Sequence, residues 1–459
     1  MTAAPVLLWF RQDLRLSDHA ALIAALEDGP VVPVYILDDD TPRHRRMGGA
    51  NRWWLHHSLS ALDEALRAKG ARLILRRGTS DGELGKLAEE TGASRVHCIR
   101  HYEPWWRNAE RAVAKRIDVV CHDGNYLLPP GTVTNGSGDP YRIYTPFSRA
   151  VLQHMPPPAP KQAPQSVHGP AHWPASDKLT DWALLPTRPD WAKGFAEDWT
   201  PGEAGAKERV ADLSDIVPDY GDARNRPSEE GSSRLSPHLH FGEVSPATVW
   251  HAVHGRSAGA ETFKLELIWR DYAQGIIASF PDYGSRNGRD RFDALRWRSG
   301  AAAKADLRAW QKGETGYPIV DAGMRQLWAT GWMHNRVRMI TASFLIKHLL
   351  IDWREGEQWF WDTLVDADYG NNCTNWQWVA GTGLDANMFG RIMAPLTQSA
   401  KFDAADYIRR WVPELAGLDD AAIHDPETSG KRPRDYPAPV IGHREGRERA
   451  LAAYAQVKG

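Results

Sequence analysis

The sequence predicts an α/β N-terminal domain, with a Rossmann-like parallel sheet and flanking helices, joined by a long linker to an all-α C-terminal domain. Three observations predict this class. Short apolar runs alternate with amphipathic segments up to about residue 130, proline is dense between residues 155 and 205, and helical patterns dominate from about residue 206. The expected domains are residues 1–130 and 206–459, with an interdomain linker at 131–205.

The N-terminal domain contains apolar runs that are typical of buried parallel strands. They are Val6 to Phe10, Val31 to Leu37, Arg72 to Leu75 and Val96 to Ile99. Between them, apolar residues recur at helical spacing from Trp54 to Leu66 and from Leu84 to Ala88. This alternation predicts right-handed crossovers between parallel strands. The sequence has no GxGxxG after the first run and no GxxxxGK(S/T), so it does not indicate a dinucleotide or P-loop site there.

The linker is expected to lie along the protein surface rather than to move freely. Its proline-rich stretch, Pro156 to Gln165, has no sustained periodicity. Four tryptophans can attach the linker to the folded surface. They are Trp173, Trp182, Trp191 and Trp199.

Charge and cysteine content narrow the classes of function. Lys and Arg number 56 against 58 Asp and Glu, a net charge of −2, so a polyanion would need a local basic patch. The three cysteines, Cys98, Cys121 and Cys373, form no CxxC pair and predict neither a disulfide framework nor a cysteine-based zinc site. We therefore expect no metal and a reducing, cytoplasmic location.

No signal peptide or membrane span is expected. The N-terminal apolar run is very short and charges follow it, the reverse of the order in a signal peptide. The most apolar later stretch, Met339 to Ile351, contains Lys347 and His348 and is shorter than the roughly 20 residues that cross a bilayer. A soluble protein without a membrane partner is expected.

Two polar segments are candidate ligand sites. In SSRLSPHLHFGEVSP, from Ser232 to Pro246, hydroxyls at an expected helix start suit a phosphate, although simple capping explains the same pattern. In FKLELIWRDYAQGI, the residues Glu266, Trp269 and Arg270 share one helical face. That face suits a planar polar ring, and a buried salt bridge beside core tryptophan is the alternative.

A third segment, from Gly331 to Trp353, is unusually polar for a helix among apolar residues. Asn335, Arg338 and Met339 share one face, whereas Arg336 is expected to point elsewhere. Buried polar groups need partners, and a structural ion network is the alternative to a ligand site. The possible partners are Asp366, Asp368 and Asn372, with Arg391 as a further cation.

The chain contains 21 tryptophans, an abnormal number, and two of them follow the third segment in NWQW. Trp376 and Trp378 are two residues apart and cannot share a helical face. One is expected to face inward while the other lines a cavity. Most of the remaining tryptophans are expected to be core packing.

Together these motifs resemble the photolyase and cryptochrome flavoprotein family. The similar segments are VLLWFRQDLRLSD, SRLSPHLHFGEVSP, ELIWRDY, the stretch from GYPIVDAGMRQLW to NNCTNWQW, and RIMAPLTQSAKFDAADYIRRWVPEL. They follow the family's order from residue 5 to about residue 455. Within the family, the sequence is most similar to microbial cyclobutane pyrimidine dimer photolyases of class I or a close relative.

The resemblance implies that the C-terminal helical domain binds FAD. By motif position, the phosphate-side residues are Tyr220, Ser232, Ser233, Arg234, Leu235 and Ser236. The residues around the ring and sugar are Arg270, Asn335, Arg338, Asp366, Asp368 and Asn372. Asn372 resembles the amide that photolyases place near the flavin N5, where plant cryptochromes have Asp, and this favours repair.

The resemblance also implies light-driven repair of UV-damaged DNA. An electron would pass from photoexcited reduced FAD to a flipped-out cyclobutane dimer, and no obligatory protein partner is implied, so a monomer is expected. The dimer-binding positions are Glu266, Trp269, Asn335, Met339 and Trp378, and the positions that contact DNA phosphates are Arg224, Arg336 and Lys401. The expected catalytic residues are Glu266, Asn335 and a chain of tryptophans that refills oxidised flavin, namely Trp376, Trp353 and Trp297.

Many relatives carry a light-harvesting antenna, which is methenyltetrahydrofolate, a deazaflavin or a flavin. The stretch from His101 to Glu110 departs from the expected folate-site pattern, so no antenna is assigned. The residues near predicted strand ends where such a ligand could rest are Phe10, Arg11, Asp38, Arg52 and Glu103.

Three alternatives remain open at this point. A cryptochrome-type photoreceptor would use the same flavin and tryptophans without repair, and a (6-4) photoproduct photolyase would act on another lesion. Against the photoreceptor, the chain ends soon after the family similarity, and Asn372 and Trp378 favour the enzyme. A tryptophan-rich carbohydrate enzyme would use Asp366 and Asp368 as paired carboxylates, but no barrel pattern supports it.

Overall fold

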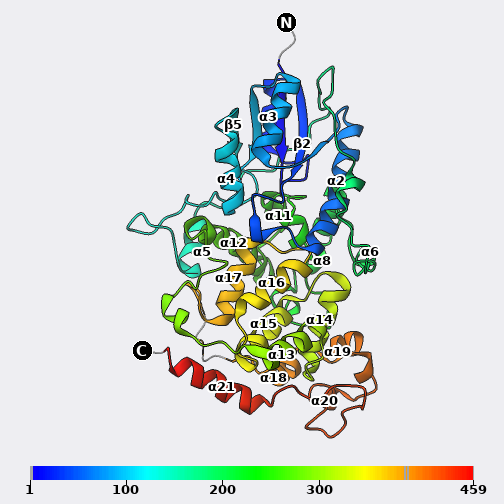
Figure 1. Cartoon of the computed structure of the whole chain (residues 1–459), viewed down its shortest axis with the longest axis vertical. Helices are drawn as coiled ribbons and strands as arrows, with labels where there is room; N and C mark the ends of the chain where they lie inside the picture. The colour runs from blue at the N-terminus through cyan, green and yellow to red at the C-terminus, as the bar shows by residue number, and fades with distance from the viewer. Residues whose placement is uncertain (1–3, 387–388, 390–391, 458–459) are drawn as a thin grey trace. The chain divides into compact units, whose positions relative to one another are not determined.

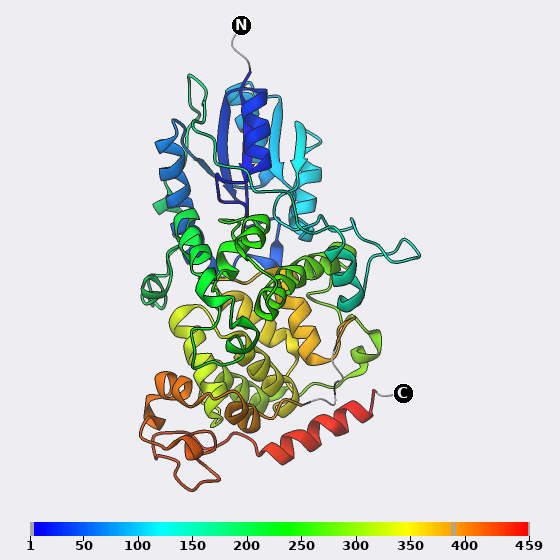
Figure 2. The same cartoon turned by 180° about the vertical axis from the view of Figure 1, so that it is seen from behind.

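The computed structural model describes residues 4–386, 389 and 392–457. The chain forms two compact units, Met1–Asp215 with Ser233–Pro281, and Ile216–Ser232 with Asp282–Gly459 (Figures 1 and 2). The expected domain limits stay a prediction, because compactness alone does not show which segment folds by itself. Arg391 lies outside the described residues.

The first unit contains a five-stranded sheet and the helices that cover it. Its strands are β1 (Val6–Phe10), β2 (Val31–Leu37), β3 (Ile74–Arg77), β4 (Arg95–Ile99) and β5 (Asp118–His122). Its helices and 3₁₀ turns are α1 (Ala20–Asp28), η1 (Arg43–Arg45), α2 (Gly49–Ala68), α3 (Ser80–Thr91), α4 (Pro104–Val113), α5 (Tyr144–Leu152), η2 (Leu179–Trp182), α6 (Phe195–Asp198), α7 (Glu203–Ala211), α8 (Leu213–Ile216, across the limit of the unit), α10 (Ser236–His240), α11 (Pro246–Ala252) and α12 (Ala258–Ser279).

The sheet is wholly parallel, in the order β3-β2-β1-β4-β5, as the apolar runs predicted. In the central strand β1, Leu8 pairs with Pro33 on one side and with His97 on the other. Strands β1 and β2 are buried along their whole length, which explains their continuous apolar sequences. Helix α3 lies in front of the sheet in Figure 1 and α1 in front of it in Figure 2, so both faces are covered.

Two strands differ from the prediction. β3 begins at Ile74 rather than at Arg72, because Asp63 of α2 accepts a hydrogen bond from the Leu73 amide (2.8 Å) and the ladder with β2 starts one residue later. β5 was not predicted at all. It is an edge strand with mostly half-buried residues, so its short apolar run carries a weak pattern.

The linker is attached to the first unit through its tryptophans, as expected. Trp182 is buried and donates to Asp177 (3.1 Å). Trp199 packs edge-on against Trp54, with ring centroids 5.4 Å apart. The remaining two are fixed by ring contacts, Trp173 below the guanidinium of Arg72 and Trp191 against Phe195. The linker is therefore part of the packed unit.

The regular elements of the second unit are all helices among its described residues, as the sequence predicted. Its elements are α9 (Tyr220–Ala223), η3 (Asp290–Ala294), α13 (Gly300–Lys312), α14 (Pro318–Thr330), α15 (Asn335–Ser343), η4 (Phe344–His348), α16 (Trp353–Thr363), α17 (Tyr369–Ala380), α18 (Pro395–Lys401), α19 (Ala405–Trp411), η5 (Pro413–Leu415), α20 (Asp420–Ile423) and α21 (His443–Ala455). Helix α15 packs against α14 and α17, and α16 packs against α17. These contacts bring the polar segments of α15 and α17 together.

The charges inside the apolar stretch after Met339 lie in η4, a single π-helical turn that continues α15. Lys347 is fully buried, and its amine donates to the last carbonyl of α17, Ala380 (2.7 Å). Burial lowers the pKa of Lys347 well below its usual range, and nearby Arg289 adds to the effect. His348 Nε2 lies 2.8 Å from Nδ1 of His443 on α21. None of the described helices has the length and apolarity that a membrane crossing needs.

Candidate functional site

The centre of the candidate site in the second unit is an ion pair between α15 and the start of α17. Arg338 Nη1 and Nη2 donate to the two carboxylate oxygens of Asp366 (3.1 and 2.9 Å), and Nε donates to the Met333 carbonyl (2.7 Å). The Asp366 side chain is only 3% exposed. This bidentate ion pair fixes the orientation of the guanidinium plane. The structure therefore gives Arg338 the partner that the sequence offered.

The first turn of α17 orients two further predicted residues. Asp368 caps the helix and accepts from the backbone and side-chain nitrogens of Asn371 (2.7 and 2.8 Å). Asn372 donates its amide hydrogens to the Glu357 carbonyl (3.0 Å) and to Glu357 Oε1 (2.9 Å) on α16. Because Glu357 engages this NH₂ group, the group that Asn372 offers to a ligand is its carbonyl oxygen, an acceptor.

Glu357 was missed by the sequence analysis. It is 1% exposed and lies on the same face of α16 as Trp353 and Phe360, both of which are buried. A carboxylate at a core position of an amphipathic helix is a signal that could have identified it, because such a group requires hydrogen-bond donors.

An aromatic cluster lies beside these polar residues. Trp376 is buried, its ring centroid is 5.0 Å from that of Phe360, and it meets Trp310 edge-on at 6.3 Å. The glycine at 356 allows the approach, because a Cβ there would lie 2.1 Å from Trp376 Cη2. Trp376 therefore faces inward, whereas Trp378 is half-buried, as their spacing predicted.

The other two tryptophans of the expected chain lie on and before α16. Trp353 is fully buried, and its indole donates to Asn287 (3.0 Å). Trp297 is half-buried, and the next residue, Arg298, bonds to the carbonyls of Leu349 and Leu350 (2.7 and 2.8 Å). The Trp297 segment therefore lies against the chain that leads into α16.

Two of the three predicted phosphate-contacting cations lie over the ring of Phe402. Arg336 lies over its ring at 4.6 Å and bonds to Asn225, and Lys401 lies over it at 5.3 Å. Arg224, which precedes Asn225, lies over Tyr220 at 5.4 Å. The two remaining predicted residues of α15 are Asn335, which is exposed, and Met339, which is half-buried.

One orientation differs from the expectation. Arg336 was expected to point away from Met339, but its Nη1 lies 3.7 Å from the Met339 sulfur. Residues three apart are neighbours on a helix, and the long arginine side chain bridges that gap. Cation and thioether thus share one surface.

The first unit holds the predicted residues of α12. Trp269 stacks on Tyr144 with ring centroids 3.6 Å apart and planes 5° apart. Arg270 bonds to the carbonyls of Asn125 and Leu239 and lies over Tyr126. Glu266 is half-buried on the same helix. The structure fixes the Trp269 ring and the Arg270 guanidinium but leaves their role a prediction.

The serine-rich segment is divided between the units, with Tyr220 and Ser232 in the second and the residues from Ser233 in the first. Arg234 has a positive φ of 51° and lies 3.4 Å from Asp198, and Leu235 is buried. The expected helix start is the five-residue α10, which Ser236 opens without a side-chain cap. Such a short helix provides little dipole for an anion, so any phosphate contact would depend on the side chains.

A cavity of about 410 Å³ lies within the first unit, beyond the carboxyl end of β4. His101, Tyr102 and Glu110 line one side, Tyr141 and Asp271 another. Burial raises the pKa of Asp271 to about 7, and its Oδ1 has no hydrogen-bond partner among the described residues. The sequence analysis suggested five residues for an antenna, namely Phe10, Arg11, Asp38, Arg52 and Glu103. None of these five residues lines the cavity.

The chain matches two protein-family models. The model described as "DNA photolyase" matches residues 6–165, and the one described as "FAD binding domain of DNA photolyase" matches residues 263–456. A deoxyribodipyrimidine photo-lyase of Agrobacterium fabrum is 48% identical over 100% of this chain and 99% of its own length.

Solved structures agree with these matches. A bacterial class III photolyase from Agrobacterium tumefaciens has a TM-score of 0.94 at 48% identity, covering 100% of this chain and 98% of that one. An archaeal photolyase from Sulfolobus tokodaii, described with two FAD molecules, has a TM-score of 0.85 at 28% identity, covering 98% and 100%. The sequence motifs had pointed to class I or a close relative.

The chain therefore belongs to the photolyase/cryptochrome family, and its fold and FAD cofactor are as expected. The residues of the second unit fit that cofactor, because they present carboxylate and amide oxygens for ring and sugar donors around a fixed guanidinium. A carbohydrate enzyme is excluded by the same matches.

Proposed function

We propose that the chain repairs cyclobutane pyrimidine dimers in UV-damaged DNA with light, as a deoxyribodipyrimidine photo-lyase. Full-length relatives with that name support the activity, at 48% and 39% identity, and the sequence-based prediction of this enzyme is confirmed. The observation that carries the proposal is the Arg338–Asp366 pair and the Asn372 carbonyl beside buried Trp376. The FAD-binding family model matches this region.

When bound, FAD supplies the photoexcited electron that splits the dimer. Arg338 and Asp366 would hold the ring system in place, and Asp368 would accept from it or from the sugar. Asn372 would accept a hydrogen bond through its carbonyl, in an orientation that Glu357 sets. Tyr220, Ser232, Ser233, Arg234, Leu235 and Ser236 would serve the phosphate side, and Arg270 the sugar or ring.

Aromatic and thioether side chains would hold the lesion by packing against it. Trp378, Trp269 and Met339 would pack against the dimer, and Glu266 and Asn335 would bond to its polar edge. Arg224, Arg336 and Lys401 would contact DNA phosphates, which the cluster around Phe402 supports. Flipping a damaged base out of the duplex costs less free energy than flipping a normal base, because its stacking is already lost.

Electrons that refill oxidised flavin would travel through Trp376, Trp353 and Trp297. Support comes from the position of Gly356, which lets Trp376 contact the helix that begins at Trp353. The bonds of Arg298 to Leu349 and Leu350 support the last step.

An antenna chromophore would occupy the cavity beside β4. Tyr102 and Tyr141 suit a flat ring, and the buried Asp271 carboxyl suits a ring N–H donor. A folate, a deazaflavin or a second flavin would fit this chemistry, and the Sulfolobus photolyase is described with two FAD molecules. We propose that the protein works in the cytoplasm as a monomer.

The test uses the full chain with reduced FAD and an oligothymidylate that carries cyclobutane dimers. Blue light should restore the thymine absorbance, whereas the dark sample should not change. A cryptochrome-type photoreceptor would bind FAD and be photoreduced but leave the dimers intact. A second oligonucleotide with a (6-4) photoproduct should stay unrepaired, and its repair would contradict the lesion assignment.

A further inference from the structure

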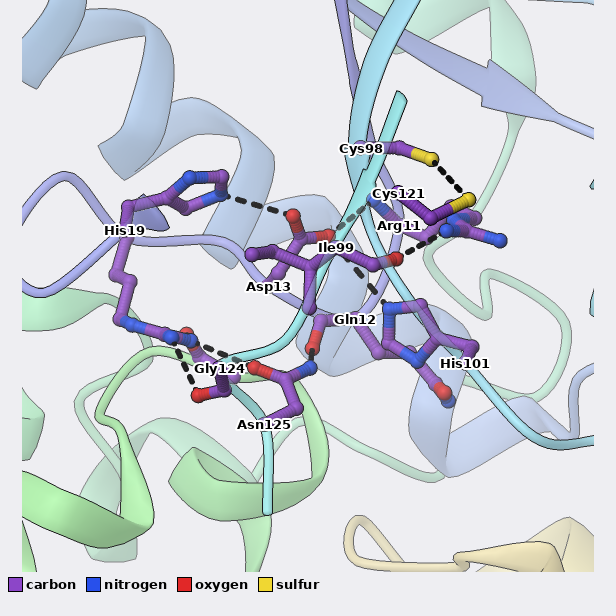
Figure 3. A network of polar contacts seen from close by, with 12 residues as sticks. Arg11, Gln12, Asp13, His19, Cys98, Ile99, His101, Cys121, Gly124 and Asn125 are labelled. Carbon is purple, nitrogen blue, oxygen red and sulfur yellow. Dashed lines mark hydrogen bonds and ion pairs between the residues drawn. The ribbon is translucent and has the colours of Figure 1, made fainter. Parts of the chain in front are cut away.

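Two of the three cysteines meet on neighbouring strands of the first unit. Cys98 on β4 and Cys121 on β5 are register partners, so their side chains lie on the same face of the sheet. Their sulfur atoms are 3.6 Å apart, joined by an S–H to S hydrogen bond (Figure 3). Neither residue has a role in the flavin or DNA chemistry proposed above.

The two thiols differ in access to solvent. Cys98 is fully buried, whereas Cys121 is half-buried on β5, which is one of the two edge strands of the sheet. Cys121 is therefore the more accessible of the two thiols.

The hydrogen bond between the two thiols favours ionisation of Cys121 over ionisation of Cys98. The hydrogen bond from Cys98 lowers the pKa of Cys121, against burial and the nearby Glu110 carboxylate, and the guanidiniums of Arg11 and Arg100 add to the lowering. The same hydrogen bond, together with burial, raises the pKa of Cys98. Cys121 is thus the more easily ionised of the two thiols, and the thiolate is the form of cysteine that attacks peroxides.

Arg11 is held rigidly in this position. It is 1% exposed, it forms an ion pair with Glu110 (2.7 Å), and it lies 4.3 Å from the ring centroid of Trp9 and 5.6 Å from that of Trp106. The guanidinium therefore has one position beside the two thiols, where its charge lowers the pKa of each of them.

We propose that Cys121 and Cys98 form a reversible redox modification site, in which a peroxide oxidises Cys121 and Cys98 resolves the product to a disulfide. The Cys121 thiolate attacks one peroxide oxygen, the O–O bond breaks, and Cys121 becomes a sulfenic acid while water leaves. The Cys98 sulfur then displaces the sulfenic hydroxyl as a second water. In total, two thiols and one hydrogen peroxide give one disulfide and two waters, and a dithiol reverses the change by exchange.

A metal ion is the competing occupant of the same place. Ligand atoms of Cys98, Glu110 and Cys121 lie within 4.8 Å of one another. However, Arg11 already neutralises Glu110 and faces the same sulfur atoms, so a divalent cation would be repelled or would have to displace it. The redox pair needs no such rearrangement.

The direct experiment treats the reduced full chain with stoichiometric hydrogen peroxide. The protein is then unfolded, free thiols are alkylated, and the peptides are mapped by mass spectrometry. We expect only Cys373 to be alkylated, a cross-linked peptide that joins Cys98 to Cys121, and three alkylated cysteines after dithiothreitol. Overoxidation of Cys121 with a free Cys98, a cross-link between two chains, or three surviving thiols would each overturn the proposal.

Single variants separate the two roles. Cys121→Ser should slow peroxide consumption by at least about tenfold, because the thiolate is the nucleophile. Cys98→Ser should leave a Cys121 sulfenic acid that dimedone traps. The matched control Cys373→Ser, at a buried cysteine of the second unit, should react like the parent. Equal rates of peroxide consumption in Cys121→Ser and the parent would contradict the redox assignment. So would protection of both thiols of the parent from peroxide by one equivalent of Zn²⁺. If Cys98→Ser does not fold, the peptide map of the parent chain decides.

Discussion

At the residue scale, Trp376 is closely packed and lies one turn after Asn372, a residue of the proposed flavin site. Its indole lies against Phe360 and Trp310 and above Gly356, so the ring has one position. Asn372, one turn earlier on α17, presents an acceptor because Glu357 uses its amide hydrogens. Fixed geometry of this kind suits electron transfer, in which the distance between rings sets the rate.

Trp376→Phe should slow photoreduction of oxidised FAD by at least about tenfold, which corresponds to about 1.4 kcal/mol in the barrier. Phenylalanine keeps the packing but is much harder to oxidise. Repair with chemically prereduced FAD should be unchanged. Flash photolysis measures the first rate and dimer loss the second, with Trp361→Phe as a buried control on α16. Loss of repair with prereduced flavin would assign Trp376 to another role.

Trp378→Ala should weaken binding of dimer-containing DNA by about 1–3 kcal/mol, since one stacking surface is lost. FAD content should stay the same, because Trp378 is half-buried and is not part of the Arg338–Asp366 ion pair, which we propose for the flavin site. Fluorescence anisotropy with damaged and undamaged duplexes measures the loss. The control is Trp328→Ala, at a tryptophan that is 44% exposed and stacks on Trp359. Equal affinity of Trp378→Ala and the parent would remove the residue from the lesion pocket.

At the element scale, the contact between α16 and α17 depends on a glycine. A methyl group at 356 would lie 2.1 Å from Trp376 and 2.6 Å from Leu345 Cδ2, and neither neighbour has room to move. Alanine is favoured over glycine in a helix by roughly 1 kcal/mol, but the steric overlap here should outweigh that gain. We therefore expect Gly356→Ala to lower the free energy of unfolding by about 1–3 kcal/mol. Urea unfolding measures this.

The control for this prediction is Gly85→Ala on α3, where a Cβ would make an ordinary contact of 3.5 Å with Arg116. That variant should be as stable as the parent or slightly more stable. If both variants gained stability, α16 and α17 would have to be separated more widely than the structure has them.

Helix α12 carries a buried acid that makes stability depend on pH. Burial raises the pKa of Asp271 to about 7, and it raises that of Asp321 on α14 to about 6. The folded state therefore holds more protons than the unfolded state between about pH 4 and pH 7, so stability falls as the pH rises through that window. For Asp271 the fall is at most about 4 kcal/mol.

Asp271→Asn should flatten this dependence and raise stability at pH 8. The Leu128 amide still finds an oxygen acceptor there, and no charge is buried. Thermal unfolding between pH 4 and pH 8 gives the slope, and Glu261→Gln removes an exposed carboxylate from the same helix as a control. A slope equal to that of the parent would show that Asp271 is ionised in the folded protein.

At the scale of the whole molecule, the sequence predicted the features that depend on local hydrophobic pattern. It missed the side-chain contacts between residues that are far apart in the sequence. Continuous apolar runs identified four of the five strands. The edge strand at the β4 side, β5, was missed because its partly exposed residues need not be apolar. The sequence offered Asp366, Asp368 and Asn372 as possible partners of Arg338, and the structure shows the pair with Asp366. Two interactions could not be read from a local pattern, because each joins residues on different helices. They are the hydrogen bond from Asn372 to Glu357 and the bond from buried Lys347 to the last carbonyl of α17.

The net charge of −2 leads to a last prediction, on salt. Without a global positive field, attraction to DNA has to come from local cations, for which we propose Arg224, Arg336 and Lys401, so affinity should still fall steeply as salt rises. In Arg224→Ala/Lys401→Ala, the slope of log K against log salt should shrink by roughly one for each contact removed. Lys431→Ala, which removes a cation paired with Asp419, should keep the parent slope. An unchanged slope in the double variant would place the DNA backbone on another surface, whereas an equal decrease in all variants would mean that only net charge matters.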